Sequence, residues 1–239
     1  MTIWFVTVFP EMIKAYLSES MFKKAVDSDL VTFHVWDLRD FTHDKHRQVD
    51  DKPFGGGAGM VMMPEPFFQA NDRLEELQGD RPFKVICPSP QGKLLTHQTA
   101  VDLANGDDIV FFCGHYKGID ERVMENLVDE EISIGDYVLT GGELPALVIA
   151  DTIIRHIPGV LNSYESAESD SFADDLLEGP IYTQPREYRN LQVPEILLSG
   201  NHAKIDEWRY QQRLARTNER RKELLKAKTG KNDVGGKNG

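Results

Sequence analysis

Three short stretches combine glycine or proline with polar residues where an apolar run ends. They read CPSPQG (87–92), CGHYKG (113–118) and SIGDYVLTGGELPA (133–146). Because ligands of open α/β sheets bind beyond the carboxyl ends of the strands, these loops could hold a ligand with backbone amides, carbonyls and apolar walls. None has the Lys-Ser/Thr pair of a phosphate loop, which argues against a triphosphate. Each could also be a tight turn, but three at corresponding strand ends favour a binding site.

A fourth candidate, DKPFGGGAGMVMMP (51–64), places four glycines within five positions. Glycine permits positive φ angles and a close approach of the backbone to another group. The dinucleotide-binding fingerprint does not fit, because it needs a G-x-G-x-x-G turn that opens directly into a helix, whereas this cluster leads into an apolar run and Pro64. The cluster is therefore either a structural turn or a contact with a different ligand.

Four arginines near the C-terminal end share one face of an expected helix. They are Arg209, Arg213, Arg216 and Arg220, and Ile205, Trp208 and Leu214 can pack inward. Such a face is either solvated or in contact with phosphate. The charge distribution favours phosphate, because residues 204–231 carry ten basic and four acidic side chains, a balance of +6, in a protein whose net charge is -12.

An acidic segment precedes this basic end. Residues 161–178 hold six acidic side chains and no Lys or Arg, which predicts a mobile linker. We therefore expect an α/β domain over residues 1–160, an acidic flexible linker over 161–175, and a small C-terminal helical domain over 176–239 with a disordered tail.

The first 160 residues alternate β-branched or aromatic runs with helical patterns, which predicts an α/β domain with a largely parallel sheet. The expected strands cover residues 2–9, 31–38, 82–89 and 108–115, with weaker ones at 59–63 and 132–139. The expected helices cover residues 10–17, 19–26, 66–77, 96–104, 121–128 and 144–157, and a long polar helix runs to about residue 228. The helix over 144–157 is apolar around most of its circumference, which predicts burial on several sides, partly against a second subunit.

The sequence pattern predicts a cytoplasmic protein. No apolar run approaches the roughly 20 residues of a membrane span, and the start MTIWFVTVFPEM lacks the features of a signal peptide. Cys87 and Cys113 each end an apolar run outside any C-x-x-C pair, so buried thiols are favoured over a disulfide or a zinc site.

A series of long motifs resembles, in order, the bacterial tRNA (guanine-N1) methyltransferase family. The motifs are FPEM, DDKPFGGGAGMVMMPEP, CGHYKGIDERV, SIGDYVLTGGELPALVIAD, IIRHIPGVL, SDSFADDLLEGPIYTQP, VPEILLSGNHAKIDEWR and RLART, from about residue 1 to residue 217. The resemblance implies a SPOUT-type α/β fold with a deep trefoil knot, a homodimer, S-adenosylmethionine as methyl donor and tRNA as substrate. The implied product is N1-methylguanosine immediately 3′ of the anticodon, which supports reading-frame maintenance.

The resemblance also implies roles for individual residues. The knotted loops of the family form the cofactor pocket, which corresponds here to Pro88, Ser89, Pro90, Gly114, Tyr116, Gly118, Ile134, Gly135, Tyr137, Leu139, Gly141, Gly142 and Leu144. Asp170 would remove the N1 proton of the guanine, and Arg155 would stabilise the negative charge on O6. The acidic linker of one subunit would fold over the pocket of the other, so that the site would be shared.

Other interpretations of these residues stay open. Arg155 lies four residues after Asp151, the spacing of a surface ion pair on a helix, and Asp170 is one of six acids in its segment. Substrate contact is expected for Gly59, Glu178, His202, Arg209, Arg213 and Arg216. Glu178 could equally face solvent, and His202 could cap or pack near the turn at Gly200.

Three positions depart from the common family pattern. His115 and Lys117 stand where Arg and Glu are usual, and Gln184 stands where Arg is usual. The family is associated with Mg²⁺, but Lys117 removes a carboxylate and no ligand cluster marks a metal site. Two other classes of function are alternatives: a nucleotide-dependent oxidoreductase, which the failed fingerprint disfavours, and a non-catalytic RNA-binding module.

Overall fold

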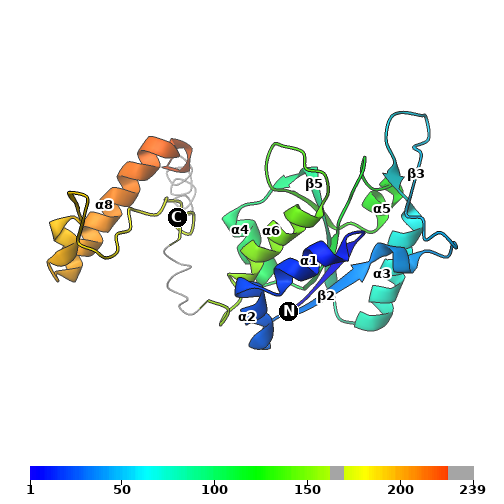
Figure 1. The fold of residues 1–239 in the computed structure, drawn as a ribbon, viewed down its shortest axis with the longest axis horizontal. Helices are drawn as coiled ribbons and strands as arrows, with labels where there is room; N and C mark the ends of the chain where they lie inside the picture. Colours follow the sequence, from blue (N-terminus) through cyan, green and yellow to red (C-terminus); the bar gives the residue numbers. More distant parts are fainter. Residues whose placement is uncertain (162–169, 226–239) are drawn as a thin grey trace, which may run out of the picture. The chain divides into compact units, whose positions relative to one another are not determined.

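Two compact units, residues 1–162 and 163–239, make up the computed structural model (Figure 1). The structure describes residues 1–161 and 170–225. Residues 162–169 of the predicted linker, and the predicted disordered tail, lie outside the described residues. Within the described ranges, no helix combines the length and the apolar character that crossing a bilayer requires.

A parallel sheet forms the centre of the first unit. Its strands are β1 (Thr2–Thr7), β2 (Thr32–Asp37), β5 (Phe83–Leu94), β6 (Asp108–Phe112) and β7 (Glu130–Ser133). They lie in the order β2-β1-β6-β5-β7, and every neighbouring pair is parallel. The prediction of an α/β domain with a largely parallel sheet is confirmed. The carboxyl ends of these strands share one edge, where ligands of such sheets bind.

The two weaker strand predictions need correction. Residues 61–62 form β4 (Val61–Met62), which pairs antiparallel with β3 (Asp50–Asp51) in a separate two-stranded sheet. The strand expected over residues 132–139 ends at Ser133, because the chain turns at Gly135, where φ is 149°.

Helices cover both faces of this sheet (Figure 1). One face carries α1 (Pro10–Leu17), α2 (Ser20–Asp27), α4 (His97–Ala104) and α6 (Glu143–Ile154). The other face carries α3 (Pro64–Gln78), α5 (Glu121–Asn126) and the 3-10 helix η1 (Leu38–Phe41). α1 has the predicted bounds, because Pro10 suits the first turn of a helix. α6 ends at Ile154 rather than at residue 157.

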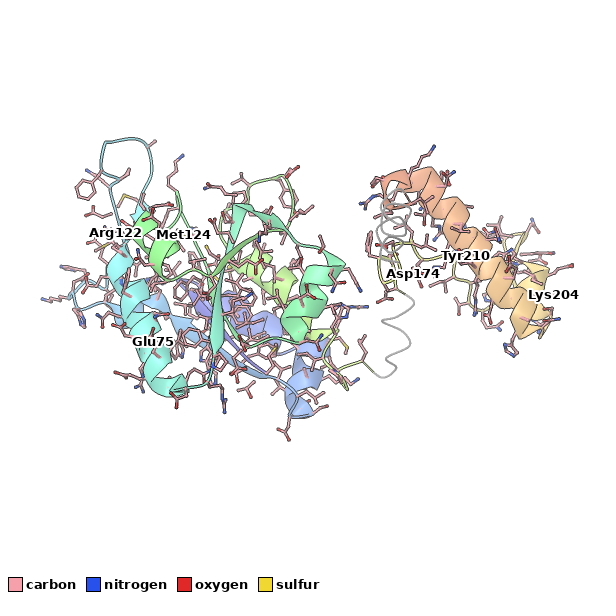
Figure 2. All side chains as sticks on the ribbon, turned by 180° about the vertical axis from the view of Figure 1, so that it is seen from behind. Glu75, Arg122, Met124, Asp174, Lys204 and Tyr210 are labelled. Atoms are coloured by element: carbon pink, nitrogen blue, oxygen red, sulfur yellow. The ribbon has the colours of Figure 1, made fainter. Side chains whose placement is uncertain are left out.

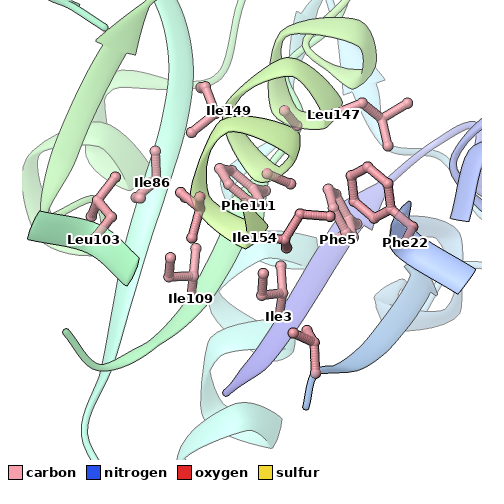
Figure 3. Close-up of a cluster of buried hydrophobic side chains, with 14 of the residues drawn as sticks. Ile3, Phe5, Phe22, Ile86, Leu103, Ile109, Phe111, Leu147, Ile149 and Ile154 are labelled. Atoms are coloured by element: carbon pink, nitrogen blue, oxygen red, sulfur yellow. The ribbon is translucent and has the colours of Figure 1, made fainter. Parts of the chain in front are cut away.

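Alternation along β1 divides the core between the two faces. Successive side chains of a strand point to opposite sides, so Ile3 and Phe5 pack with α2 and α6 (Figure 3), whereas Trp4 and Val6 pack with α3. Phe5 stacks on Phe111 of β6, with ring centroids 5.2 Å apart. This packing fixes β1 and β6 beside each other and places their carboxyl ends together.

One long helix, α8 (His202–Arg220), organises the second unit. Asn201 caps it by accepting a hydrogen bond from the Lys204 N–H at 3.2 Å. The smaller elements are β8 (Glu187–Tyr188), β9 (Leu191–Gln192) and η2 (Glu195–Leu198). α8 ends at Arg220, because the backbone leaves the helical region at Arg221, where φ is -143° and ψ is 54°. Residues 222–225 are helical again, and the remainder of the predicted helix lies outside the described residues.

Residues 170–178 pack on α8, although we expected a mobile linker through residue 175. Leu176 is fully buried, and the Leu177 N–H donates to the Thr217 hydroxyl at 2.9 Å. Asp174 lies beside α8 and forms an ion pair with Arg213 (Figure 2). This part of the predicted linker is therefore held by the helix, and at least one of its acidic side chains, Asp174, has a basic partner there.

Candidate active site

The three Gly- and Pro-rich stretches line one cavity of about 330 Å³ in the first unit. Those at 113–118 and 133–146 follow β6 and β7 as expected. The stretch at 87–92 is instead a bulge within β5, whose pairing with β7 shifts register between Pro88 and Lys93. Every predicted cofactor-binding residue except Leu144 lies in the wall of this cavity: Pro88, Ser89, Pro90, Gly114, Tyr116, Gly118, Ile134, Gly135, Tyr137, Leu139, Gly141 and Gly142.

Close backbone packing joins the second and third of these stretches. The Gly142 N–H donates to the Gly114 carbonyl at 2.7 Å, and His115 pairs with Gly141 in an isolated antiparallel bridge. A Cβ atom at position 142 would lie 2.9 Å from the Gly114 nitrogen, and one at position 141 would lie 2.6 Å from Cδ2 of His115. Both glycines are therefore required for this approach.

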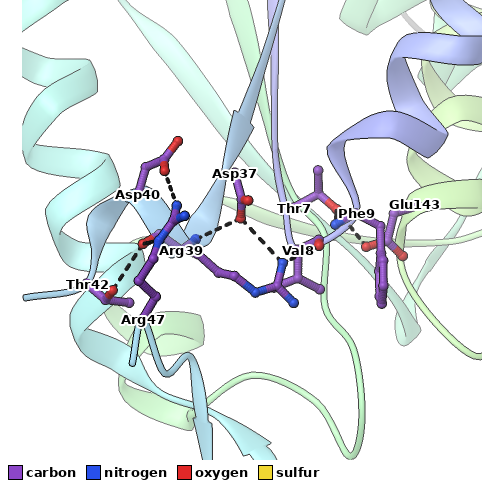
Figure 4. Close-up of polar contacts among 9 residues, drawn as sticks. All are labelled: Thr7, Val8, Phe9, Asp37, Arg39, Asp40, Thr42, Arg47 and Glu143. Atoms are coloured by element: carbon purple, nitrogen blue, oxygen red, sulfur yellow. Dashed lines mark hydrogen bonds and ion pairs between the residues drawn. The ribbon is translucent and has the colours of Figure 1, made fainter. Parts of the chain in front are cut away.

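A buried carboxylate lies at the start of α6, within the third stretch. Glu143 is 2% exposed and accepts a hydrogen bond from the Thr7 hydroxyl at 2.7 Å (Figure 4). The same hydroxyl oxygen accepts from the Phe9 N–H at 2.9 Å. The N-terminus of a helix also favours a negative charge. Glu143 thus connects the end of β1 to the beginning of α6. This connection also fixes the end of the cavity loop that leads into α6.

His115 and Lys117, two departures from the family pattern, both line the cavity. Nδ1 of His115 is buried and has no hydrogen-bond partner among the described residues. The His115 ring packs against Phe9 and Tyr116, with centroids 5.0 Å away in each case. The cavity wall therefore includes an imidazole whose Nδ1 is buried, and a lysine where the family has a carboxylate.

The glycine cluster connects β3 to β4. Gly55, Gly56, Gly57 and Gly59 have φ angles of 82°, 81°, 118° and 92°, so the turn itself requires glycine. A Cβ at position 59 would lie 2.8 Å from Cγ of Lys117. The structural interpretation therefore explains the cluster, and its last glycine reaches the rim of the cavity.

Both cysteines are free and buried, as predicted. Burial raises the pKa of the Cys87 thiol to about 12, and the charge of Glu131 adds to the shift. Burial, more than the charge of Glu143, raises the pKa of Cys113 well above its usual value. The two thiols are therefore protonated at neutral pH and are poor nucleophiles.

The predicted catalytic residues belong to different units: Arg155 to the first and Asp170 to the second. Arg155 is the C-cap residue of α6. Burial raises the pKa of Asp151, one turn earlier, and the positive charge of Arg155 opposes that rise. The electrostatic contact expected from the spacing of Arg155 and Asp151 is therefore present. Asp170 is half-buried at the beginning of the segment that packs on α8.

Two of the four arginines of α8 hold this segment. Arg213 pairs with Asp174 and donates to the Leu177 carbonyl at 3.4 Å. Arg216 donates to the Glu178 carbonyl at 3.0 Å. Their spacing along the helix is thus explained by protein contacts, whereas the sequence analysis assigned them to phosphate.

The other substrate candidates of the second unit are Glu178, His202 and Arg209. Glu178 is half-buried, and its N–H donates to the Ser171 hydroxyl at 2.9 Å. His202 is the first residue of α8, and Arg209 forms an exposed ion pair with Asp206 at 3.5 Å. Both His202 and Arg209 line a second cavity, which lies within this unit.

Sequence analysis missed part of the cavity wall. Glu131 and Ile132 of β7 line it, as do Glu121 and Met124 of α5. The strand residues lie directly before a predicted loop, and the helix residues are three apart on one face. The spacing of Glu121 and Met124 indicates that they share a helical face. Only the orientation of α5 in the structure shows that this face lines the cavity.

No metal site is evident in the part of the chain that the structure describes. Within residues 1–161 and 170–225, no three His, Cys, Asp or Glu side chains are grouped so that they could hold a metal ion. Lys117 also places a cation in the cavity wall. These residues do not fit a magnesium site.

Comparison with known proteins gives consistent matches over almost the whole chain. A family model described as tRNA (Guanine-1)-methyltransferase TrmD matches residues 1–227. A tRNA (guanine-N(1)-)-methyltransferase of Staphylococcus epidermidis is 52% identical over 225 residues, which cover 94% of this chain and 91% of that protein. The protein of the same name from Clostridioides difficile is 50% identical over 220 residues, with 92% and 95% coverage.

Proposed function

This chain belongs to the tRNA (guanine-1)-methyltransferase family, and from that premise we propose that it methylates N1 of the guanosine immediately 3′ of the tRNA anticodon. It is an enzyme that uses S-adenosylmethionine as the methyl donor. The main support for the proposal is that almost all of the predicted cofactor-binding residues line one cavity. Because its substrate is tRNA, we assign the cytoplasm as its place of action. The oxidoreductase and the non-catalytic RNA-binding module are not favoured.

The volume of the cavity and the residues of its wall support S-adenosylmethionine as its ligand. Its volume of about 330 Å³ lies in the usual range of small-molecule sites. Gly141 and Gly142 line the cavity and allow its loops to pack closely, and Leu139 and Ile134 supply apolar surface. When bound, the cofactor supplies a methyl group on a positively charged sulfur. The residues of the chain would bind it, orient it and keep water away.

We assign the proton transfer to Asp170 and the charge stabilisation to Arg155. N1 of guanine carries a proton at neutral pH, so a base must accept it as the nitrogen attacks, and a carboxylate can do so. The electron density then moves to O6, where a guanidinium would stabilise it. Both assignments rest on the family motifs, and Asp151 lies close enough to Arg155 for the charge of the arginine to oppose the rise that burial causes in the pKa of the Asp151 carboxyl group. No step goes through Mg²⁺, because the described residues do not fit such a site.

We further propose a homodimer with the SPOUT knot of its family. Support for the dimer comes from exposed apolar side chains on two neighbouring helices. Met12 and Tyr16 of α1 are 46% and 49% exposed, and Leu144 and Val148 of α6 are 53% and 44% exposed. Each pair has the i, i+4 spacing of one helical face, and α1 contacts α6. Leu144 and Val148 lie on the face of α6 that a second subunit would bury, as the sequence pattern predicted for this helix. In such a dimer the segment with Asp170 could serve the cavity of the partner.

Contacts to the tRNA are assigned to the remaining candidates. Gly59 lies beside Lys117 at the cavity rim, and Glu178 belongs to the same packed segment as Asp170. His202 and Arg209 line the second cavity. For Arg213 and Arg216 we propose a supporting role in place of direct phosphate contact, because both bond to residues 174–178.

Methyl transfer to defined transcripts tests the proposal. The protein is incubated with labelled S-adenosylmethionine and tRNA transcripts that carry guanosine or adenosine 3′ of the anticodon. We expect label only in the guanosine transcript, in a product identified as N1-methylguanosine after nuclease digestion. Equal labelling of both transcripts would refute the position, and saturable cofactor binding without any transfer would refute the reaction.

A further inference from the structure

The second cavity lies entirely within the C-terminal unit and has a volume of about 530 Å³. One wall is a face of α8, since His202, Ile205 and Arg209 have the i, i+3, i+7 spacing of a helical stripe. Residues 180–184, Arg186 and η2 supply the other walls. The cavity therefore has its own wall residues, none of which lines the cofactor cavity.

The charged side chains of this wall are basic. Arg186 and Arg209 line the cavity beside the imidazole of His202, and none of the described residues that line it is Asp or Glu. Arg209 has one acidic neighbour, Asp206 at 3.5 Å, but both side chains are more than 60% exposed, so the pair is screened and weak. In a protein of net charge -12, this concentration of positive charge points to an anionic ligand.

The apolar part of the wall suits a flat aromatic group. The Tyr182 ring is 46% exposed, and Ile205, 7% exposed, forms part of the buried floor. Aromatic side chains in such grooves stack on nucleobases, while arginine forks bind phosphate. A free inorganic anion would bind to the arginines without contacting the tyrosine ring. A nucleotide would bind the arginines through its phosphate and stack its base on the tyrosine.

We propose that this cavity binds one nucleotide of the substrate tRNA, with the base stacked on Tyr182 and a backbone phosphate held by Arg186 and Arg209. The inference rests on the proposed function, because it takes the ligand to be part of the methylated tRNA. It adds a binding site, separate from the cofactor cavity, whose residues contribute affinity for RNA and take no part in methyl transfer.

The test compares tRNA binding by the full-length protein and four variants at several salt concentrations. Tyr182→Ala removes the stacking ring, and we expect a loss of about 5- to 150-fold in tRNA affinity. Tyr182→Phe should retain it. The matched control is Tyr188→Ala, because Tyr188 is 59% exposed in the same unit and does not line the cavity. The double variant Arg186→Gln with Arg209→Gln should lower the log-log salt slope by about one unit per lost phosphate contact.

Affinity for S-adenosylmethionine should be the same in all variants, because the cofactor cavity is untouched. Equal tRNA affinity of Tyr182→Ala and Tyr188→Ala would overturn the inference, as would an unchanged salt slope in the double variant. If the parent methylates tRNA and these variants bind it normally, the nucleotide site is wrong while the proposed function stands. If the parent transfers no methyl group to tRNA, the proposed function itself fails.

Discussion

The hydroxyl of Thr7 donates a 2.7 Å hydrogen bond to Oε1 of Glu143, although the two residues lie 136 positions apart in the chain. Thr7 is fully buried at the end of β1, and Glu143 is 2% exposed at the start of α6. A buried carboxylate without a donor is costly, so this bond stabilises the position of α6 and of the cavity loop that leads into it.

Thr7→Val should remove that donor while it preserves the size and branching of the side chain. We expect a decrease of about 1–3 kcal/mol in the free energy of unfolding, because Glu143 then stays buried without this partner. Urea denaturation measures the change. Thr32→Val is the control, since Thr32 is exposed on the edge strand β2 and should shift stability by less than about 0.5 kcal/mol. Equal losses in the two variants would show that the bond contributes nothing.

Gly142→Ala should abolish binding of S-adenosylmethionine. The added Cβ would lie 2.9 Å from the Gly114 nitrogen and 3.1 Å from the Cys113 Cα, so the two cavity loops must separate. Isothermal titration calorimetry measures the affinity. Gly106→Ala serves as control, because its Cβ would meet nothing closer than 3.4 Å. A Gly142→Ala protein with the parent's affinity would mean that the loops tolerate this displacement.

Asp170→Asn should retain cofactor affinity and lose about 10²- to 10⁴-fold in turnover, because an amide cannot accept the N1 proton. Single-turnover methylation of a tRNA transcript measures the loss. Asp175→Asn makes the same change of charge in the same packed segment and should stay within a few-fold of the parent. Turnover of Asp170→Asn within about tenfold of the parent would contradict the assignment of the base.

Val148→Glu should dissociate the proposed dimer, because it places a charge on the exposed apolar face of α6. Analytical ultracentrifugation should show the monomer for this variant and the dimer for the parent. Leu77→Glu introduces the same charge at another exposed apolar position, 52% exposed on α3, and should remain dimeric. If Asp170 serves the cavity of the partner, the Val148→Glu monomer also loses methyl transfer. A parent protein that sediments as a monomer would refute the dimer.

Alkaline pH should destabilise the protein through Cys87. Its pKa is raised from 9.0 to about 12 in the folded state, so above pH 9 the unfolded chain releases a proton that the folded chain retains. The free energy of unfolding should therefore fall between pH 9 and pH 12, with a limiting slope of about 1.4 kcal/mol per pH unit for this group. Cys87→Ala should have a shallower slope, measured by urea denaturation across this range. An identical slope in Cys87→Ala and the parent would assign the effect to other groups.

Much of the first unit could be predicted from local patterns. Pro10 and the spacing of apolar residues gave the bounds of α1, and apolar runs located the strands of the parallel sheet. Local patterns marked the Gly- and Pro-rich stretches as candidate binding loops, because they stand next to those runs and the parallel order brings them together. The individual cofactor residues could be named only from the resemblance to the family. Leu144, which the resemblance also implied, is 53% exposed on α6 and does not line the cavity, so its role in cofactor binding stays a prediction.

The sequence by itself determined the residue types, the periodicities and the family motifs, because these depend on neighbours within a few positions. Only the tertiary structure decided that Arg213 and Arg216 bind residues 174–178, that Thr7 meets Glu143, and that Tyr182 shares a cavity with Arg209. Helical spacing shows that arginines share a face but not what lies opposite that face. Contacts between distant residues depend on how the whole chain packs, and the same charged stripe can therefore face solvent, phosphate or a carboxylate of its own chain.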